Sequence, residues 1–271
     1  MGKEEYFISK FQNATIGDDG AFIDGVVYSK DLFCEDIHFK RSWMSLKQIA
    51  NKSMLVNISD AIAMNAKPLY ALLGLSIPTT FSFQHLDELA QGFNEVAKEY
   101  GVKIIGGDTT SGTKLMISVT IVSKTKNPIF RKSLKVGDFL AYTGDVGESK
   151  KGLTTLLRGG RLSSKKRFIK PCLKAGFFYE ASRYVHSALD ISDGLSKDLS
   201  RICSKKCGVK FFKKFSKREL CSGEEYEMLF SFDKRHLSKI RNIANKHKTP
   251  LRVFGKTVRG RYRSCCKENH F

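Results

Sequence analysis

The sequence predicts an α/β (α+β) protein with two domains. Its 271 residues exceed the roughly 150 that one domain usually holds, and 41% of them are hydrophobic, which is enough for substantial cores. Segments with helical periodicity alternate with short apolar runs of β type. The composition changes around residues 130–138, where basic residues, proline and glycine interrupt the apolar pattern. We therefore place a domain boundary between residues 1–132 and residues 133–271.

Short strands and a helix follow one another in the first domain. Residues 26–31 are a run of β type, and residues 115–122 form an alternating to fully apolar strand. Residues 86–100 carry apolar side chains at helical spacing, and Gly101 follows where a helix commonly ends. The next apolar run, residues 102–105, predicts a further short strand.

Residues 46–65 fit a helix that is apolar around much of its circumference, and Pro68 follows as a stop signal. On such a helix Asn57, Asp60 and Met64 fall on one stripe, because they are three and four residues apart. Asp60 therefore projects from an otherwise buried helix, a position that is costly for a carboxylate without a partner.

The second domain is predicted to begin with a strand at residues 139–142. This strand leads into residues 143–153, a glycine-rich loop that enters a helix and is similar to a phosphate cradle. The loop lacks the G-x-x-x-x-G-K-[ST] pattern of a P-loop, so alone it is weak evidence for a nucleotide. Residues 211–215 alternate aromatic and basic side chains, which is typical of a strand end with one buried face.

Four short motifs place aspartates beside glycine, serine or threonine. They are Gly17-Asp18-Asp19, Asn57-Ile58-Ser59-Asp60, Gly106-Gly107-Asp108-Thr109 and Asp190-Ile191-Ser192-Asp193-Gly194. Mg2+ takes carboxylate oxygens and bridges substrate phosphates, and small neighbours let phosphates approach the backbone. Any one motif is ordinary turn chemistry, but the four together predict a magnesium and nucleotide site. Asp108 is expected just past the end of the strand at 102–105, where α/β sheets collect ligands.

Seven cysteines are scattered without a paired C-x-x-C framework, which suits a reducing cytosol. Cys203 and Cys207 lie four residues apart without the partners of a zinc set, so we interpret them as packing or surface thiols. No apolar run approaches the roughly 20 residues of a membrane-spanning helix, and the first seven residues do not resemble a signal peptide. We expect a cytoplasmic protein without a membrane segment.

The chain is strongly basic, with 47 Lys and Arg against 27 Asp and Glu and a formal net charge of +20. Such an excess favours anionic partners, which include nucleotides, nucleic acid and acidic lipid. The sequence contains no helix-turn-helix, zinc-finger or RNP-type pattern. A basic nucleic-acid-binding protein with structural aspartates is therefore an alternative that rests on charge alone. Its binding should weaken steeply as the salt concentration rises.

Taken in order, the motifs resemble the thiamine-monophosphate kinase family, whose superfamily includes aminoimidazole ribonucleotide synthetase and selenophosphate synthetase. The matching stretches cover most of the chain: residues 16–19, Asp31, residues 35–39, residues 52–68 as K-x4-N-x-S-D-x-x-A-M-x-A-x-P, residues 105–110, Arg131, residues 189–195 and residues 222–227. The resemblance implies a PurM-like fold of two α/β domains, in which the first domain forms a shared barrel in a homodimer. It implies direct in-line transfer of the γ-phosphoryl group of ATP to thiamine monophosphate, without a phosphoenzyme.

The family pattern also implies roles for residues of this chain. It implies magnesium ligation by Asp19, Ser29, Lys30, Asp31, Asp60, Asp108, Asp190 and Asp193, with backbone groups acting at Ser29 and Lys30. It implies ATP contacts by Gly107, Arg131 and Ser192, and substrate contacts by His38 and Glu224. Both reactants are polyanions, so Mg2+ and an arginine are expected to lower their repulsion. A phosphate oxygen is already nucleophilic near neutral pH, so no residue is expected to act as a general base.

Two departures from the family pattern concern the acceptor. Residues 222–227 read Ser-Gly-Glu-Glu-Tyr-Glu where the family usually has Gly-Gly-Glu-Asp-Tyr-Glu, so Glu225 replaces a shorter acid. The family's aromatic residue over the thiamine ring has no counterpart near the C-terminus other than Phe271. Another enzyme of the superfamily, acting on a different small acceptor, is therefore an alternative. The chain lacks the well-placed reactive cysteines that a selenophosphate synthetase or a hydrogenase-maturation relative would carry.

Overall fold

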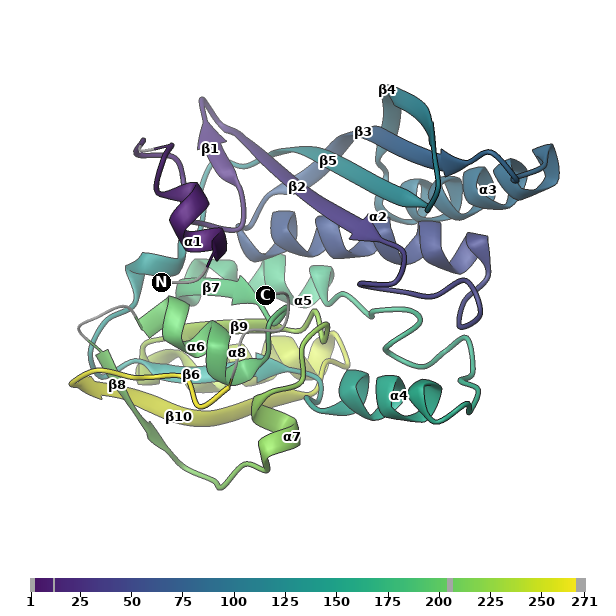
Figure 1. Cartoon of the computed structure of the whole chain (residues 1–271). Coiled ribbons are helices and arrows are strands. Elements are labelled where there is room, and N and C mark those ends of the chain that lie inside the picture. Colours follow the sequence, from purple (N-terminus) through teal and green to yellow (C-terminus); the bar gives the residue numbers. More distant parts are fainter. Residues whose placement is uncertain (1–2, 12, 204–206, 267–271) are drawn as a thin grey trace.

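The structure is a computed structural model that describes residues 3–11, 13–203 and 207–266. Two five-stranded sheets lie one above the other, with helices between and around them (Figure 1). This arrangement confirms the predicted α/β (α+β) class. The sheets lie on either side of a short 3-10 helix, η1 (Arg131–Ser133), and the domain division at residues 132/133 stays a prediction. None of the described helices is long and apolar enough to cross a membrane.

The first sheet has the strand order β1-β2-β5-β3-β4, in which only β3 and β4 are parallel neighbours. Its strands are β1 (Ala21–Ile23), β2 (Val26–Cys34), β3 (Lys67–Pro78), β4 (Lys103–Gly112) and β5 (Met116–Lys124). β2 and β5 confirm the strands predicted at residues 26–31 and 115–122. α2 ends before Pro68, as this stop signal predicts. Pro68 is also the second residue of β3, a strand that the sequence pattern does not predict.

β4 runs through the glycine-aspartate motif and does not end before it. Asp108 therefore lies inside β4, and the prediction that it follows a strand end is wrong. A Cβ on Gly107 would lie 1.7 Å from the carbonyl oxygen of Leu73, and the φ of Gly107 is 154°. Only glycine lets the two backbones approach so closely at this position, and the pairing of β4 with β3 continues past it.

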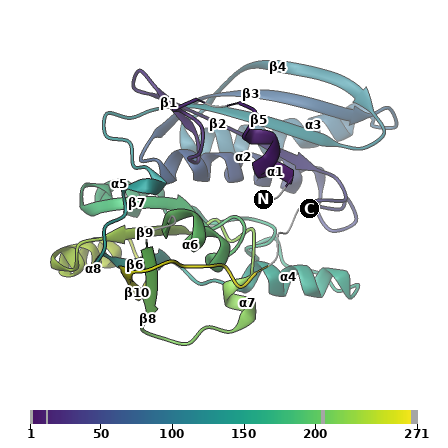
Figure 2. The ribbon, with the colours of Figure 1, turned by 60° about the vertical axis from the view of Figure 1, so that its left-hand side comes forward.

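Two helices cover one face of the first sheet and lie between the two sheets (Figures 1 and 2). α2 (Leu46–Ala63) and α3 (Phe83–Tyr100) each begin with a capping box, at Ser45 and Ser82. They confirm the two predicted helices, although α2 ends two residues earlier and α3 begins three residues earlier than expected. Gly101 ends α3 in the left-handed conformation with φ 66°, as predicted.

The second sheet is entirely antiparallel, with the order β7-β9-β6-β10-β8. Its strands are β6 (Phe139–Thr143), β7 (Val185–Asp190), β8 (Cys207–Phe211), β9 (Met228–Phe232) and β10 (Leu251–Arg259). β6 confirms the strand predicted at residues 139–142. β8 ends at Phe211, which confirms a strand end at the start of the aromatic and basic run.

Helices cover both faces of the second sheet, so β9 is buried at every position. Met228, Phe230 and Phe232 pack in the larger apolar cluster with α5 and α8, whereas Leu229 packs in a second cluster with α6. The remaining described helices are α1 (Lys3–Ile8), α4 (Glu148–Leu157), α5 (Ala175–Ala181), α6 (Leu195–Cys203), α7 (Lys217–Leu220) and α8 (Leu237–Lys246), with 3-10 helices at Ser182–Tyr184 and Lys234–His236. α4 confirms the helix predicted after the glycine-rich loop.

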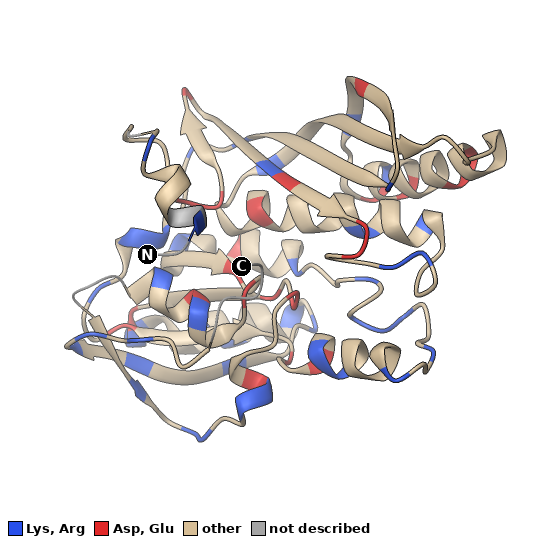
Figure 3. Ribbon diagram, in the orientation of Figure 1, with Lys and Arg blue, Asp and Glu red and all other residues tan. Residues whose placement is uncertain are grey.

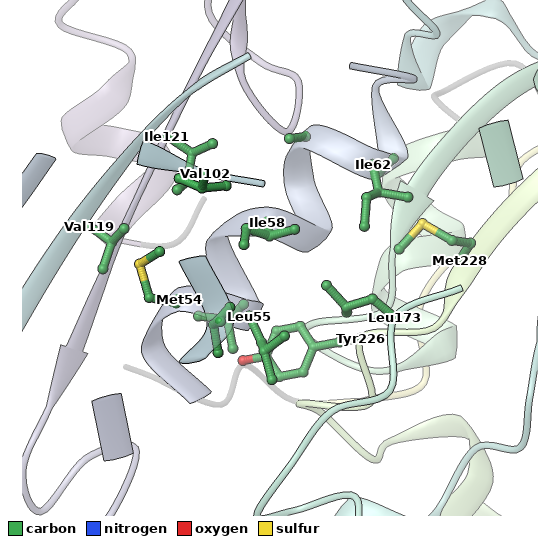
Figure 4. Close-up of a cluster of buried hydrophobic side chains, with 14 of the residues drawn as sticks. Met54, Leu55, Ile58, Ile62, Val102, Val119, Ile121, Leu173, Tyr226 and Met228 are labelled. Atoms are coloured by element: carbon green, nitrogen blue, oxygen red, sulfur yellow. The ribbon is translucent and has the colours of Figure 1, made fainter. Parts of the chain in front are cut away.

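The larger apolar cluster joins the two halves of the chain through α2. In Figure 4, Val119 and Ile121 of β5 lie on one side of this helix, and Leu173 and Met228 lie on the other. Nearly every residue of α2 is buried, as its apolar circumference predicts. Side chains of α2 therefore meet residues of both halves.

Two cysteine predictions have different outcomes. Cys203 and Cys207 are buried free thiols, which confirms that they pack in the interior. Cys221 and Cys266, however, form a disulfide that no spacing pattern indicates.

Candidate active site

Three aspartates from distant parts of the chain meet between the two sheets. Carboxylate oxygens of Asp19, Asp60 and Asp190 all lie within 4.8 Å of one another, and we call these residues the three-carboxylate group. Asp19 lies in the loop before β1, Asp60 in the last turn of α2, and Asp190 at the end of β7. Figure 3 shows acidic segments of β2, α2 and β7 in this region. The structure thus joins three of the four aspartate motifs.

The acids of this region favour a proton or a cation. Burial raises the pKa of Asp19, and burial followed by the charge of Asp19 raises the pKa of Asp31 to about 6. Burial raises the pKa of Asp60 well above its usual value, and the charges of Asp31, Asp190 and Asp19 add to this effect. Burial and the charge of Asp19 likewise raise the pKa of Asp190 well above normal. Burial is the largest cause of all four shifts, and the charges of neighbouring acids add to it for Asp31, Asp60 and Asp190.

The hydrogen bonds of the three-carboxylate group fit a metal ion. Asp19 Oδ2 is buried and has no hydrogen-bond partner among the described residues. The Ser59 hydroxyl donates to Asp190 Oδ2 at 2.5 Å, which orients that carboxylate. Clustered carboxylate oxygens are the ligands that Mg2+ takes, and a cation would offset their repulsion. The donor set therefore suits Mg2+.

Arg131 lies beside the three-carboxylate group, and its contact with ATP stays a prediction. Its guanidinium pairs with Asp19, and its backbone N–H donates to both carboxylate oxygens of Asp18 at 3.1 and 3.2 Å. Burial and the charge of Asp19 raise the pKa of Asp18 to about 6. Arg131 is thus held in place by the Gly17-Asp18-Asp19 motif, with a planar cation available for phosphate.

Asp193 lies in a neighbouring group of ion pairs. Its carboxylate pairs with Arg201, and Arg201 also binds Asp198 at 2.9 Å. Asp198 accepts the backbone N–H of Asp193 at 3.1 Å, which fixes the loop between β7 and α6. Among the described residues, Asp193 is not a member of the three-carboxylate group.

Glu224 contacts a buried lysine of α2. Lys52 is fully buried, and its ammonium donates to Glu224 Oε2 at 2.8 Å and lies 4.1 Å from the centre of the Phe168 ring. The Glu224 N–H donates to the Ser192 carbonyl at 2.7 Å, so the segment that carries Glu224 is tied to the motif at residues 190–194. Glu224 adopts the left-handed conformation, φ 56°, a strain that clusters at functional sites.

The two following acids are structural. Glu225 is buried and accepts from the backbone N–H groups of Gly147 at 2.8 Å and Ser149 at 3.1 Å, at the start of α4. Glu227 is buried and pairs with Arg167. Neither residue is a solvated surface acid. Glu225 caps a helix and is anchored to α4.

Ser29 and Lys30 occupy opposite faces of β2. Ser29 is buried, and its hydroxyl donates to the Asn57 carbonyl at 3.3 Å, next to α2. Lys30 is exposed, and its ammonium donates to the Ser118 hydroxyl at 2.7 Å on the open face of the sheet. Asp31 lies on the same side of β2 as Ser29, which explains why the charge of Asp19 raises the pKa of Asp31.

The remaining predicted site residues lie outside the three-carboxylate group or outside the described part of the chain. His38 accepts the Cys34 N–H on Nδ1 at 3.0 Å, and its ring stacks on Phe33 at 5.4 Å between centroids. Gly107 and Asp108 are exposed on β4, and within the described chain Asp108 is outside the three-carboxylate group. Phe271 lies outside the described residues.

Sequence reasoning missed three charged residues of the site: Asp18, Lys52 and Arg201. Asp18 and Lys52 stand inside matched motif stretches, so their motifs were a usable signal. Arg201 lies in α6, eight residues after Asp193, and no pattern indicates its role. A salt bridge made across a loop and a helix becomes visible only in the folded chain.

Comparisons with known proteins agree with this geometry. The family model described as AIR synthase related protein, N-terminal domain, matches residues 17–125. A thiamine-monophosphate kinase of Pyrococcus horikoshii is 30% identical over 86% of this chain and 82% of the relative. One from Buchnera aphidicola is 32% identical over 88% of this chain and 82% of the relative.

A solved structure described as AaThiL complexed with AMPPCP and TMP has the same fold. It superimposes with a TM-score of 0.83 and 23% identity, over 96% of this chain and 90% of that chain. This likeness confirms the predicted two-domain PurM-like α/β fold. With the sequence identity to the two kinases, it leads to one conclusion: the chain belongs to the thiamine-monophosphate kinase family.

Proposed function

We propose that this protein transfers the γ-phosphoryl group of ATP directly to the phosphate of thiamine monophosphate and forms thiamine diphosphate. It is a transferase of thiamine biosynthesis with Mg2+ as cofactor. The convergence of Asp19, Asp60 and Asp190 supports this function most strongly, since these acids come from three matched motifs and Asp19 retains an unpartnered buried oxygen. The relatives that share these motifs are named thiamine-monophosphate kinases.

In this proposal the acids hold metal ions and the cations hold phosphates. Asp19, Asp60, Asp190 and the adjacent Asp31 hold Mg2+, which supplies positive charge between two polyanionic reactants when it is bound. Arg131, fixed by its pair with Asp19, binds the nucleotide phosphates. No described contact requires a general base, because the attacking phosphate oxygen is already ionised.

The acceptor contacts Glu224 and His38. Lys52 binds the carboxylate of Glu224, and the Ser192 carbonyl binds its backbone N–H. Glu224 is therefore held next to Ser192, to which this proposal assigns contact with ATP. A carboxylate there suits the cationic thiazolium ring of the substrate. Ser192, Asp193, Ser29 and Lys30 keep the roles that the family pattern implies for them.

Product formation tests the proposal. Purified protein is incubated with thiamine monophosphate, ATP and Mg2+, and thiamine diphosphate is quantified by chromatography against controls with EDTA and without acceptor. Metal-dependent thiamine diphosphate is the expected result. ATP binding without product would instead favour another acceptor. Salt-sensitive binding of DNA or RNA without ATP turnover would favour the nucleic-acid alternative.

We also propose a homodimer formed through the first sheet. Its face opposite α2 and α3 carries six large apolar side chains that are each 39–52% exposed: Tyr28, Leu32, Tyr70, Leu72, Ile105 and Met116. Apolar side chains gathered on one exposed face are typical of a protein–protein contact. A second copy of this sheet would cover it and close a shared barrel. Light scattering should give a dimer, and Leu32→Lys should shift it toward monomer.

The dimer also offers a role for Asp108 and Gly107, which lie on β4, an edge strand of the first sheet. Edge strands are commonly covered by another element, and in a dimer β4 would approach the partner copy. If each site takes Asp108 from the partner, a mixture of Asp60→Asn and Asp108→Asn proteins should regain up to about a quarter of the wild-type activity, since random pairing restores one site in each mixed dimer. Activity that stays at the level of the separate variants would place both acids in one chain.

A cytoplasmic location completes the proposal, because ATP and reduced thiols are available there. Cell fractionation with an antibody against the chain tests it.

A further inference from the structure

Three cysteines outside the proposed chemistry come together in the structure. Cys221 and Cys266 form a disulfide over a sequence separation of 45 residues. Cys265 is a free exposed thiol, and its Sγ lies 3.9 Å from the Sγ of Cys266. All three sulfur atoms lie within 4.8 Å of one another. We call Cys221, Cys265 and Cys266 the thiol site.

The thiol site adjoins both motif segments of the second half. Cys221 follows α7 and precedes Ser222, whose hydroxyl donates to Glu225 at 2.5 Å. A Cβ on Gly194 would lie 3.1 to 3.2 Å from backbone atoms of residues 220–222. The backbone around Cys221 therefore packs directly on the segment that follows Asp190.

The other two cysteines belong to a segment that rests on α6. The Ser196 hydroxyl accepts the Cys265 N–H at 3.1 Å and lies 2.8 Å from the Tyr262 hydroxyl. Through the disulfide, residues 262–266 are covalently tied to the start of the segment that carries Glu224. Closing or opening the bond changes how firmly this segment is held, because a cross-link restricts the motion of the chains that it joins.

We propose that Cys221, Cys265 and Cys266 form a redox-sensitive modification site, which exchanges with low-molecular-weight disulfides and thiols such as glutathione and thereby controls acceptor binding. The control of binding rests on the proposed function, whereas the modification itself does not. In a reducing compartment, disulfides are usually transient and often sense the redox state. Exposure of Cys265 gives a small thiol or disulfide access to the site.

The exchange is balanced in atoms and electrons. The Cys221 thiolate attacks one sulfur of oxidised glutathione and displaces a glutathione thiolate, and the Cys266 thiolate then attacks Cys221 Sγ and displaces the second. The protein loses two protons and two electrons, and oxidised glutathione becomes two thiols. Once the Cys221–Cys266 disulfide has formed, the Cys265 thiolate can attack Cys221 Sγ, which forms a Cys221–Cys265 bond and releases the Cys266 thiolate without an external oxidant.

Peptide mass spectrometry tests the modification. The wild type and the variants Cys221→Ser, Cys266→Ser and Cys172→Ser are equilibrated with oxidised or reduced glutathione, alkylated, and digested with trypsin without further reduction. In the oxidised wild type, peptide 219–234 should be joined to peptide 264–267. Cys266→Ser should give the same pair through Cys265, and Cys221→Ser should not. Cys172→Ser changes an exposed thiol elsewhere and should match the wild type.

Absence of the joined peptides from the oxidised wild type would overturn the modification site. Their absence from Cys266→Ser would overturn the exchange through Cys265.

Kinetics test the control of binding. Reduction of the wild type should raise KM for thiamine monophosphate by about threefold or more and lower Tm by several degrees, since the cross-link closes a long loop. Cys221→Ser should show the reduced values in both redox states. Equal KM values for oxidised and reduced wild type would overturn this control. Failure of the proposed function looks different: no thiamine diphosphate forms in either state, although the joined peptides still appear.

Discussion

Asp60 is the residue at which activity and stability should separate. Its pKa is raised by burial and by three neighbouring acids. Asp60→Asn should abolish magnesium-dependent activity, because a cation loses an anionic ligand. The metal-free protein should be at least as stable as the wild type, because one buried like charge is removed. Product assays and thermal unfolding in EDTA measure both effects. Asp87→Asn, the same change at an exposed position of α3, should alter neither. An active Asp60→Asn enzyme would refute the metal assignment.

Lys52 should act on acceptor binding through Glu224. Lys52→Met removes the cation of a pair with an N–O distance of 2.8 Å and should lower the free energy of unfolding by about 1–3 kcal/mol, because Glu224 loses its partner. KM for thiamine monophosphate should rise more than kcat falls. The double variant with Glu224→Gln should be less destabilised than the sum of the single variants. Strict additivity would show that the pair is not coupled.

The candidate site was predictable where acids stand in recognisable motifs. Asp19, Asp60 and Asp190 stand in three motifs of similar composition, and the structure brings their carboxylates together. The ion pairs of Arg201 could not be predicted, because they depend on how a loop and a helix meet. Asp108 stands in a clear motif, but its position could not be predicted from the sequence, because the pairing of β4 with β3 places it on an edge strand.

Among the elements, α4 depends on an acid in another segment. Glu225 Oε1 accepts two N–H groups at the start of this helix, as well as the Ser222 hydroxyl. Glu225→Asp, which restores the usual family residue, should shorten this reach and lower the free energy of unfolding by about 1 kcal/mol. KM for thiamine monophosphate should change little, because the side chain is directed to α4. Glu225→Gln keeps the length and an acceptor oxygen and should cost less.

A large change in KM for Glu225→Asp with unaltered thermal unfolding would assign Glu225 to the acceptor and not to the helix.

Helices and strands with a regular spacing of apolar residues were predictable from the sequence. Strands that depend on pairing with a distant segment were not. α2 and α3 follow from their apolar spacing and caps, and β5 from its alternation. β3 was not predicted, because Pro68 at its start is a residue that rarely occurs inside strands. β4 extends through two glycines because β3 offers partners to it, and such a partner strand is not visible in a local window of sequence.

For the molecule as a whole, the buried acids predict a dependence of stability on pH. The folded-state pKa values of Asp18 and Asp31, both about 6, and of Asp60 and Asp190 lie above that of an unfolded aspartate. The folded protein therefore binds more protons, and without metal its stability should fall as pH rises from about 4 through about 6 and beyond. Mg2+ competes with these protons, so its stabilising effect should grow with pH.

Thermal unfolding between about pH 5 and pH 8, in EDTA and in Mg2+, measures this dependence. The difference between wild type and Asp60→Asn separates the site from acids elsewhere, whose pKa values move in either direction: that of Glu219 is lowered by its hydrogen bonds with Ser216, and that of Asp198 is raised by burial to about 7. A metal effect that is independent of pH would contradict the proposed competition.

The position of α2 limits how the two halves of the chain can be separated or exchanged. This helix fills the core of both halves, and its Lys52 and Ser59 side chains bind Glu224 and Asp190 across the junction. A fragment cut at residues 132/133 would expose the surface of α2 that packs on the second half, so we expect the two halves to depend on each other like the subunits of an obligate complex. Domain shuffling at this point would have to carry a matching partner surface, and a split version of the enzyme should assemble only when both pieces are made together.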